Sequence, residues 1–399
     1  MGSKDRTTDQ NVAISNRKKL INMIVFSVMF AGYTLTFLVP KFYGATDAYA
    51  SVFIFVMCGI LFLNNVDLLS LIRSKNKEFI ILAVVIVIIG LNLIIIQSNK
   101  GAFFVAANFI LIWYLSDKII LTQKQISIIG GCYLGLLLIW LVIAYPVFFG
   151  NYDQIAYNTN TAATFTVYTL LCAFIFLRKL SMKHEMFGLL TVILLVRTGH
   201  LVLWHRARGA FIMLILFLFL FYLMPRLYWK NRKLYTCLIM LATIGSLLFV
   251  SLYVLIGSTG VNFRLPFFYK NIFSGRQKIW LEIAKMFVKQ PLTGIGSGYV
   301  LDSFFEYNLH NAMYDIIAVH GVIVFAGTLF FIIRRLKKFR EHAFKSELAV
   351  CALCAVFAVF FESYFDIDLI WADYAPNLLF LLAVLNTMHT TSEQEEVTG

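Results

Sequence analysis

The residue types that could do chemistry are concentrated in one polar stretch, residues 261–314, of an otherwise apolar chain. This stretch contains the sequences SGR (274–276), GIGSG (294–298) and HN (310–311). Arginine binds anions, and histidine exchanges protons near neutral pH. The stretch therefore has the residues needed to bind an anion and to catalyse proton transfer, and the rest of the chain must position them.

The composition of the chain is that of an integral membrane protein. Its 399 residues are 60% hydrophobic and 14% charged, with a mean hydropathy of +0.80, whereas a soluble domain is about 25% charged. The net charge of +13 would suit a nucleic-acid-binding protein. We exclude that class because basic residues beside membrane spans follow from the positive-inside rule. The predicted partner is the lipid bilayer.

Twelve apolar segments predict an all-α polytopic membrane protein, since one span needs about 20 mostly apolar residues. The segments are residues 20–39, 48–63, 79–97, 101–115, 126–149, 158–177, 186–203, 210–224, 234–255, 315–333, 347–361 and 374–389. We expect a single integral membrane domain over residues 1–399. Within it, residues 256–314 form a long extracytoplasmic loop between the ninth and tenth spans, with short amphipathic helices, and this loop is predicted to be catalytic.

Charge orients these spans. Lys and Arg gather in alternate loops, among them 226–233 and 334–345, so these loops and both termini are predicted to be cytoplasmic. The first apolar run is too long for a signal peptide and is read as the first span. All six cysteines fall within predicted spans and no Cys/His cluster has metal-ligand spacing, so neither a disulfide framework, a metal site nor a cofactor is expected.

Two groups of arginines go against this charge pattern. Arg206 and Arg208 lie in RARG (206–209) at the outer start of the eighth span, and Arg276 begins a predicted amphipathic helix. The start of a helix is partly positive, so an arginine there is poorly placed unless an anion binds beside it. We predict a phosphate-binding role for all three arginines. The alternative is that the first pair extends to lipid headgroups.

His310 is the candidate base, because a sugar hydroxyl must lose a proton to become a nucleophile. The alternative is a surface residue that only forms hydrogen bonds, and His200, His205 and His320 are nearby competitors. The glycine-rich turn at 291–298 is expected to shape the floor of a cavity. A nucleotide-binding role is excluded for it, because no strand precedes it and no continuous helix clearly follows.

Further side chains near the loop are candidates for contacts with a glycan. These are Trp280, Tyr299, Tyr307 and Asn311. The aromatic ones could equally form an interfacial aromatic belt. The last outer loop holds Glu362, Asp366, Asp368 and Asp373, which could contact a glycan, bind a divalent ion or offset the basic loop. The residues alone do not decide among these roles.

At these residues the chain resembles the O-antigen ligase and polysaccharide polymerase family. The resemblance rests on Arg208-Gly209 at the outer start of a span, a Ser-Gly-Arg with a Trp-containing helix at 274–280, a Pro-Leu-x-Gly-x-Gly-x-Gly at 291–298, and His310-Asn311 before a span. These motifs cover roughly residues 206–321, and the first half of the chain is similar only as generic spans. Ala207 departs from the family pattern, in which many members have Ser before Arg-Gly.

The resemblance implies a metal-independent glycosyltransferase of the bacterial cytoplasmic membrane that acts on undecaprenyl-diphosphate-linked oligosaccharides at the outer leaflet. By this resemblance Arg208 and Arg276 would hold the diphosphate, and His310 would be the base or orient the acceptor hydroxyl. The lipid diphosphate is the leaving group, so stabilising its charge is the main catalytic demand. A flippase and a chain-length regulator of the same pathway would be partners.

Three functions remain open at this point. We favour a polymerase that joins lipid-linked repeat units into capsule, exopolysaccharide or O-antigen. A ligase that transfers the finished glycan to lipid A core or another acceptor is the alternative, because the family motifs do not separate the two. A lipid-linked sugar flippase is a third hypothesis of another class, which the lack of clear repeat symmetry among the spans disfavours.

Overall fold

In the computed structural model, the regular structure of the described residues is helical. These residues are 2–96, 99–149, 158–224, 226–261, 263–265, 268, 271–302, 309–343 and 346–398. The elements, in chain order, are α1 (Gly2–Leu38), α2 (Pro40–Asn65), α3 (Leu68–Arg73), α4 (Lys77–Ile95), α5 (Lys100–Leu115), α6 (Gln123–Ile139), η1 (Trp140–Ala144), α7 (Tyr145–Phe149), α8 (Thr159–Ser181), α9 (Met186–Trp204), α10 (Arg208–Leu218), η3 (Phe219–Leu223), α11 (Arg226–Lys230), α12 (Arg232–Ser258), α13 (Arg276–Phe287), α14 (Ala312–Ala343), α15 (Glu347–Glu362), η4 (Ala372–Tyr374) and α16 (Ala375–Thr398). The predicted all-α class is confirmed.

Polar residues at the helix starts explain where many helices begin. Asn76, Asn158 and Asn231 each accept a hydrogen bond from a backbone N–H in the first turn of α4, α8 and α12. Thr122 and Gln125 form a reciprocal capping box at the start of α6. These side chains satisfy N–H groups that have no partner inside the helix.

The twelve predicted spans all coincide with helical segments, but they are not equivalent. Among the described residues, seven helices are long and apolar enough to cross a membrane. They comprise Ser15–Leu38, Lys77–Ile95, Gln123–Phe148, Thr159–Ser181, Met186–Trp204, Arg232–Ser258 and Ala312–Glu341. Tyr49–Asn65, Lys100–Leu115 and Arg208–Leu223 are shorter apolar helices, and α15 has 16 residues. The structure therefore supports seven helices of spanning length, and the count of twelve stays a prediction.

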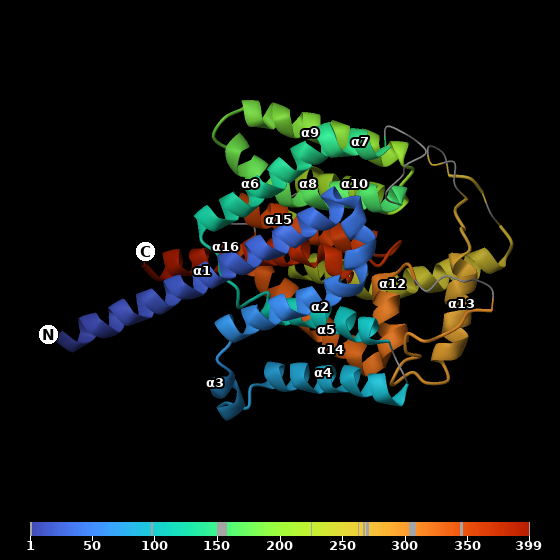
Figure 1. The fold of residues 1–399 in the computed structure, drawn as a ribbon, viewed down its shortest axis with the longest axis horizontal. Helices are drawn as coiled ribbons and strands as arrows, with labels where there is room; N and C mark the ends of the chain where they lie inside the picture. Colours follow the sequence, from blue (N-terminus) through green and yellow to red (C-terminus); the bar gives the residue numbers. More distant parts are fainter. Residues whose placement is uncertain are drawn as a thin grey trace.

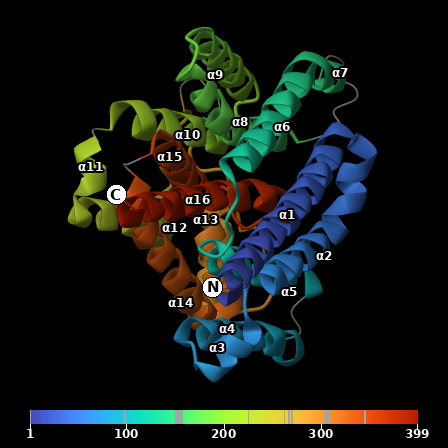
Figure 2. The same cartoon turned by 90° about the vertical axis from the view of Figure 1, so that its left-hand side faces the viewer.

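The helices differ in the fraction of their residues that is buried, and this difference separates the central helices of the bundle from the peripheral ones. In the apolar window of α8, 83% of the residues are buried, against 22% for α4 and 28% for each of α9 and α12. Figures 1 and 2 show α8, α15 and α16 near the middle of the bundle, with α9 and α4 at opposite edges. The exposed faces of the outer helices are apolar, as a lipid-facing surface requires.

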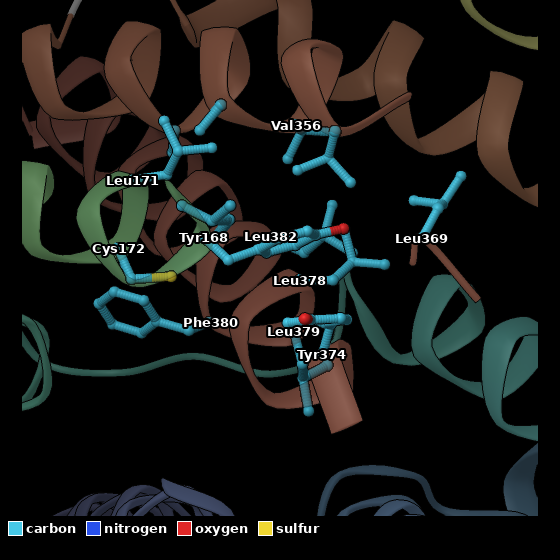
Figure 3. Packing of buried hydrophobic residues seen from close by; sticks show 14 of the residues in the cluster. Tyr168, Leu171, Cys172, Val356, Leu369, Tyr374, Leu378, Leu379, Phe380 and Leu382 are labelled. Atoms are coloured by element: carbon cyan, nitrogen blue, oxygen red, sulfur yellow. The ribbon is translucent and has the colours of Figure 1, made fainter. Parts of the chain in front are cut away.

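Aromatic packing and hydrogen bonds between helices hold this centre together. The ring of Tyr168 on α8 stacks on that of Tyr374 at 4.6 Å between centroids, beside Leu378 and Leu379 of α16 (Figure 3). The Tyr33 hydroxyl lies 2.9 Å from Thr169 Oγ1, so α1 is bonded to α8. Interhelical packing and hydrogen bonds are the main sources of helix association where lipid surrounds a bundle.

The polar loop folds at one end of the bundle. Figure 1 shows α13 at that end and both chain termini at the other. The amphipathic helix expected after Gly275 is confirmed as α13, with Ile279, Trp280 and Ile283 buried. Lys278, on its other face, is exposed.

The glycine-rich turn at 291–298 packs against α14 at the point where this helix is interrupted. Gly321 is non-helical, with φ +86°, and interrupts α14. The backbone N–H groups of Ile295 and Gly296 donate to the carbonyl oxygens of Ala318 (2.8 Å) and Val319 (3.0 Å), which the break sets free. A Cβ on Gly294 or Gly321 would collide with the opposite backbone. Both positions therefore require glycine, and the turn fixes α13 against α14.

Candidate functional site

Arg208, the first residue of α10, reaches across to the segment that precedes α13. Its Nη1 donates hydrogen bonds to the carbonyl oxygens of Asn271 (3.0 Å) and Ile272 (3.3 Å). Its Nη2 donates to Ser274 Oγ at 3.5 Å. These acceptors are neutral, so they position the guanidinium without neutralising its charge.

Arg276, the first residue of α13, lies on the other side of the same space. Its Nη1 donates to the carbonyl oxygen of Phe365, in the loop after α15. Both arginines are partly buried. In the described part of the chain, neither forms a salt bridge with a carboxylate. The hydrogen bonds of both guanidinium groups go to neutral acceptors, and the carboxyl groups of Asp366 and Glu362 lie near Arg276 without binding it directly.

Two cavities meet at these arginines. A polar cavity of about 40 Å³ is lined by both, together with residues of α8, α10, α15 and the loop after α15. A larger cavity of about 360 Å³ shares Arg208, Arg276 and Phe365 as walls. Its remaining walls are largely aromatic and aliphatic, among them Phe211 and Trp280. The arginines therefore stand between a small polar space and a larger apolar one.

His310 pairs with Asp366 at the edge of the polar cavity. Its Nδ1 lies 3.3 Å from Asp366 Oδ1, and Asp366 itself lines the cavity. The backbone of His310 has a φ of +50°, a left-handed conformation that costs about 1–2 kcal/mol for a residue with a Cβ. Such an outlier is common where a side chain must be held in a functional position.

The charge of Asp366 follows from its surroundings. Burial raises the pKa of the Asp366 carboxyl, but the hydrogen bond to His310, the charge of its imidazole when protonated and the charge of Arg276 outweigh burial and hold that pKa below its ordinary value. Asp366 is therefore ionised. It can fix the ring of His310 and stabilise the protonated imidazole, as an orienting carboxylate does beside a catalytic base.

The other acidic residues of this loop divide between two places. Glu362 lines the polar cavity, and Asp368 accepts hydrogen bonds from Glu362 and Thr164. Burial, and then the negative charge of Asp366, raise the pKa of Asp368. Asp373 lies elsewhere, at an apolar cavity of about 270 Å³ between α1, α2 and η4. Three of the four acids are thus close to the arginines.

Several predicted site residues lie away from the polar cavity. Arg206 is exposed, with a φ of +53°, in the turn that ends α9, and it is not among the described residues that line the cavity. Asn311 is fully buried and caps α14: its side-chain oxygen accepts from Ser246 Oγ and Tyr314 N, both at 2.9 Å. Asn311 therefore holds the chain next to His310 from inside the protein, where its side chain has no exposed surface.

The aromatic candidates take different positions. Trp280 is buried, donates from Nε1 to the carbonyl oxygen of Leu309 at 2.6 Å, and forms a wall of the larger apolar cavity. Tyr299 lines a separate cavity of about 460 Å³ with Lys289 and Gln290, beyond the end of α13. Tyr307 lies outside the described residues. Tyr299 is itself buried, at 9% exposed, and Trp280 faces an apolar space, so neither side chain is freely accessible.

The structure adds residues of α8 to the site that motif reasoning does not find. Asn160 and Thr164 line the polar cavity. A signal was present in the sequence, since residues 158–166 read NTNTAATFT at the start of a predicted span. Polar residues inside a membrane segment are costly and usually functional. Among the described residues, no group of three or more His, Cys, Asp or Glu is arranged to hold a metal ion.

Fold and site together define a helical protein, suited by seven apolar helices among the described residues to a membrane, with a small polar cavity lined by two arginines. Comparison with protein-family models gives no match, and comparison with curated protein sequences gives none either.

Proposed function

We propose that this protein is a metal-independent membrane glycosyltransferase that polymerises undecaprenyl-diphosphate-linked repeat units. The observation that carries the proposal is the position of Arg208 and Arg276 where a small polar cavity meets a larger apolar one. A ligand that fits both spaces has a compact anionic group joined to an apolar chain. A lipid diphosphate has this form, and the family resemblance of the motifs around these arginines supports the same substrate class.

In the proposed reaction the acceptor hydroxyl attacks the anomeric carbon of the lipid-linked sugar. The bond from that carbon to the diphosphate oxygen breaks, and a bond to the acceptor oxygen forms. The proton of the hydroxyl passes to His310, whose imidazolium is stabilised by Asp366. Arg208 and Arg276 stabilise the charge that develops on the departing lipid diphosphate, which is the largest electrostatic demand of this chemistry.

The proposal includes a location. The protein would lie in the bacterial cytoplasmic membrane with both termini in the cytoplasm and α13 at the outer surface. The gathering of Lys and Arg in alternate loops supports this orientation, and the position of both termini at the end opposite α13 supports it as well. A flippase that delivers repeat units and a chain-length regulator would be its partners.

The test is to incubate the purified protein, in lipid nanodiscs, with lipid-linked repeat units alone and to separate the products by size. A polymerase gives a ladder of chain lengths without any other acceptor. Transfer that occurs only after a lipid A core acceptor is added would replace the polymerase with the ligase. Movement of units across vesicle membranes with no new glycosidic bond would replace both with a flippase.

A further inference from the structure

Glu362 is a buried carboxyl whose function the proposed reaction leaves open. It is the last residue of α15, it is 1% exposed, and it lines the polar cavity between the arginines. Its Oε2 has no hydrogen-bond partner in the protein. A buried polar atom without a partner is unfavourable, and in a cavity it marks a place where a ligand atom completes the hydrogen bonding.

The Glu362 carboxyl also interacts with the carboxyl group of Asp368. Glu362 donates a side-chain hydrogen bond to Asp368, and a hydrogen bond between two carboxyl groups requires that one of them carries a proton. A protonated Glu362 carboxyl can donate through one oxygen and still accept a hydrogen bond at the other. The other charged or titratable groups that face it are Arg276 and Asp366 from the site and Tyr168 from α8.

Gly209 provides the space for this arrangement. A Cβ at position 209 would lie 2.8 Å from Glu362 Oε1, which is closer than such contacts normally allow. The Glu362 carboxyl therefore occupies the space that a side chain at position 209 would fill. It lines the same polar cavity as Arg208 and Arg276, where the diphosphate is proposed to bind.

The geometry of a sugar diphosphate says what such an acceptor would contact. When the anomeric carbon carries the diphosphate, one neighbour in the ring is the ring oxygen, which has no proton to donate. The other neighbour is carbon 2, whose hydroxyl or amide substituent is a donor. We propose that the Glu362 carboxyl accepts a hydrogen bond from the substituent at carbon 2 of the sugar attached to the diphosphate, which makes Glu362 a specificity-determining residue. This inference rests on the proposed function.

The test measures equilibrium binding of three soluble probes to the purified protein in nanodiscs. The probes are farnesyl diphosphate, farnesyl-diphosphate-linked glucose, and the same molecule with fluorine in place of the hydroxyl at carbon 2. Fluorine is close to hydroxyl in size but cannot donate a hydrogen bond. We expect wild type to bind the glucose probe about 10- to 100-fold more tightly than the fluorinated one, because the fluorinated probe leaves a buried acceptor unsatisfied.

Variants at position 362 test whether the Glu362 side chain causes the difference in affinity between the glucose probe and the fluorinated probe. Glu362→Ala should bind both sugar probes with equal affinity, because the acceptor is gone. Glu362→Gln should keep the discrimination, because its amide N–H donates to Asp368 while its carbonyl oxygen accepts. Glu347→Gln, at the opposite end of the same helix and paired there with Arg178, is the matched control and should discriminate like wild type.

The outcomes separate this inference from the function on which it rests. Failure of wild type to bind farnesyl diphosphate at all would overturn the proposed function. Binding of farnesyl diphosphate without discrimination between the sugar probes, or discrimination that persists in Glu362→Ala, would overturn the role of Glu362 and leave the proposed function standing. Retained binding of farnesyl diphosphate by Glu362→Ala shows that the variant is folded.

Discussion

The two ends of the helix bundle each hold arginines, but the partners of these arginines differ. At the end of α14 away from the site, Arg335 is 1% exposed and binds Glu78 through Nη2 (2.5 Å) and Asp117 through Nη1 (3.1 Å). At the other end, Arg208 and Arg276 donate to backbone carbonyl oxygens and a serine hydroxyl. Carboxylates bind the arginine of the first cluster directly, whereas in the described part of the chain none forms a salt bridge with Arg208 or Arg276.

This difference separates a structural use of arginine from a binding use. A buried guanidinium with two carboxylates has no charge left for a ligand, and it ties α14 to α4 and to the segment after α5. A guanidinium bonded only to neutral acceptors is oriented but still attracts an anion. A buried charge by itself thus says little about function. The partner of that charge indicates whether the residue stabilises the fold or is available to bind a ligand.

The largest effect is expected from Arg335→Ala. Removing this side chain leaves Glu78 and Asp117 without their buried partner, which should lower the free energy of unfolding by about 3–5 kcal/mol. The midpoint of thermal unfolding in nanodiscs measures this loss. Arg334 binds the same Glu78 but is 57% exposed, so Arg334→Ala should change stability by less than about 1 kcal/mol. Equal losses in the two variants would contradict the comparison.

The second-largest effect is expected from a substitution of Arg276, in the cluster that contains Arg208 and Arg276. Arg276→Ala should reduce polymer formation by about 10²- to 10³-fold, because one donor to the developing charge of the leaving group is lost. Its unfolding midpoint should fall by less than that of Arg335→Ala, since no carboxylate loses a directly bonded partner. Lys278→Ala, which removes an exposed cation from the same helix, is the control and should remain active. Normal polymer from Arg276→Ala would remove this arginine from the mechanism.

The smallest effect is expected from Asp366→Asn, which should lower the transfer rate about 10- to 100-fold by weakening the bond that orients His310. The pKa of Asp366 is lower in the folded protein than its ordinary value of 3.8. Its contribution to stability is therefore complete above that ordinary value and is lost as pH falls through the lower, folded value. Wild type should lose stability in this acid range more steeply than Asp366→Asn, and parallel curves of unfolding midpoint against pH would argue against the pairing.

Much of the helical framework could be predicted because membrane helices leave a local signal. A long run of apolar residues predicts both a helix and an apolar environment around it. The spacing of Ile279, Trp280 and Ile283 predicts which face of α13 is buried. The number of spans could not be predicted as reliably. Helices such as α15 are short and buried by neighbouring helices, and a local window of hydropathy cannot tell protein from lipid as the surrounding medium.

The sequence by itself determined that this is a helical protein suited to a membrane, with arginines at two helix starts, where we predict that an anion binds. Both facts follow from local patterns of apolar and charged residues. Only the tertiary structure decided which of these residues meet. It brings Arg208, Arg276 and the pair Glu362 and Asp366 to one cavity from three separate segments, and it leaves Arg206 exposed only two residues before Arg208. The physical reason is that helix packing and turn geometry set the direction of each side chain, and neither is encoded in spacing along the chain.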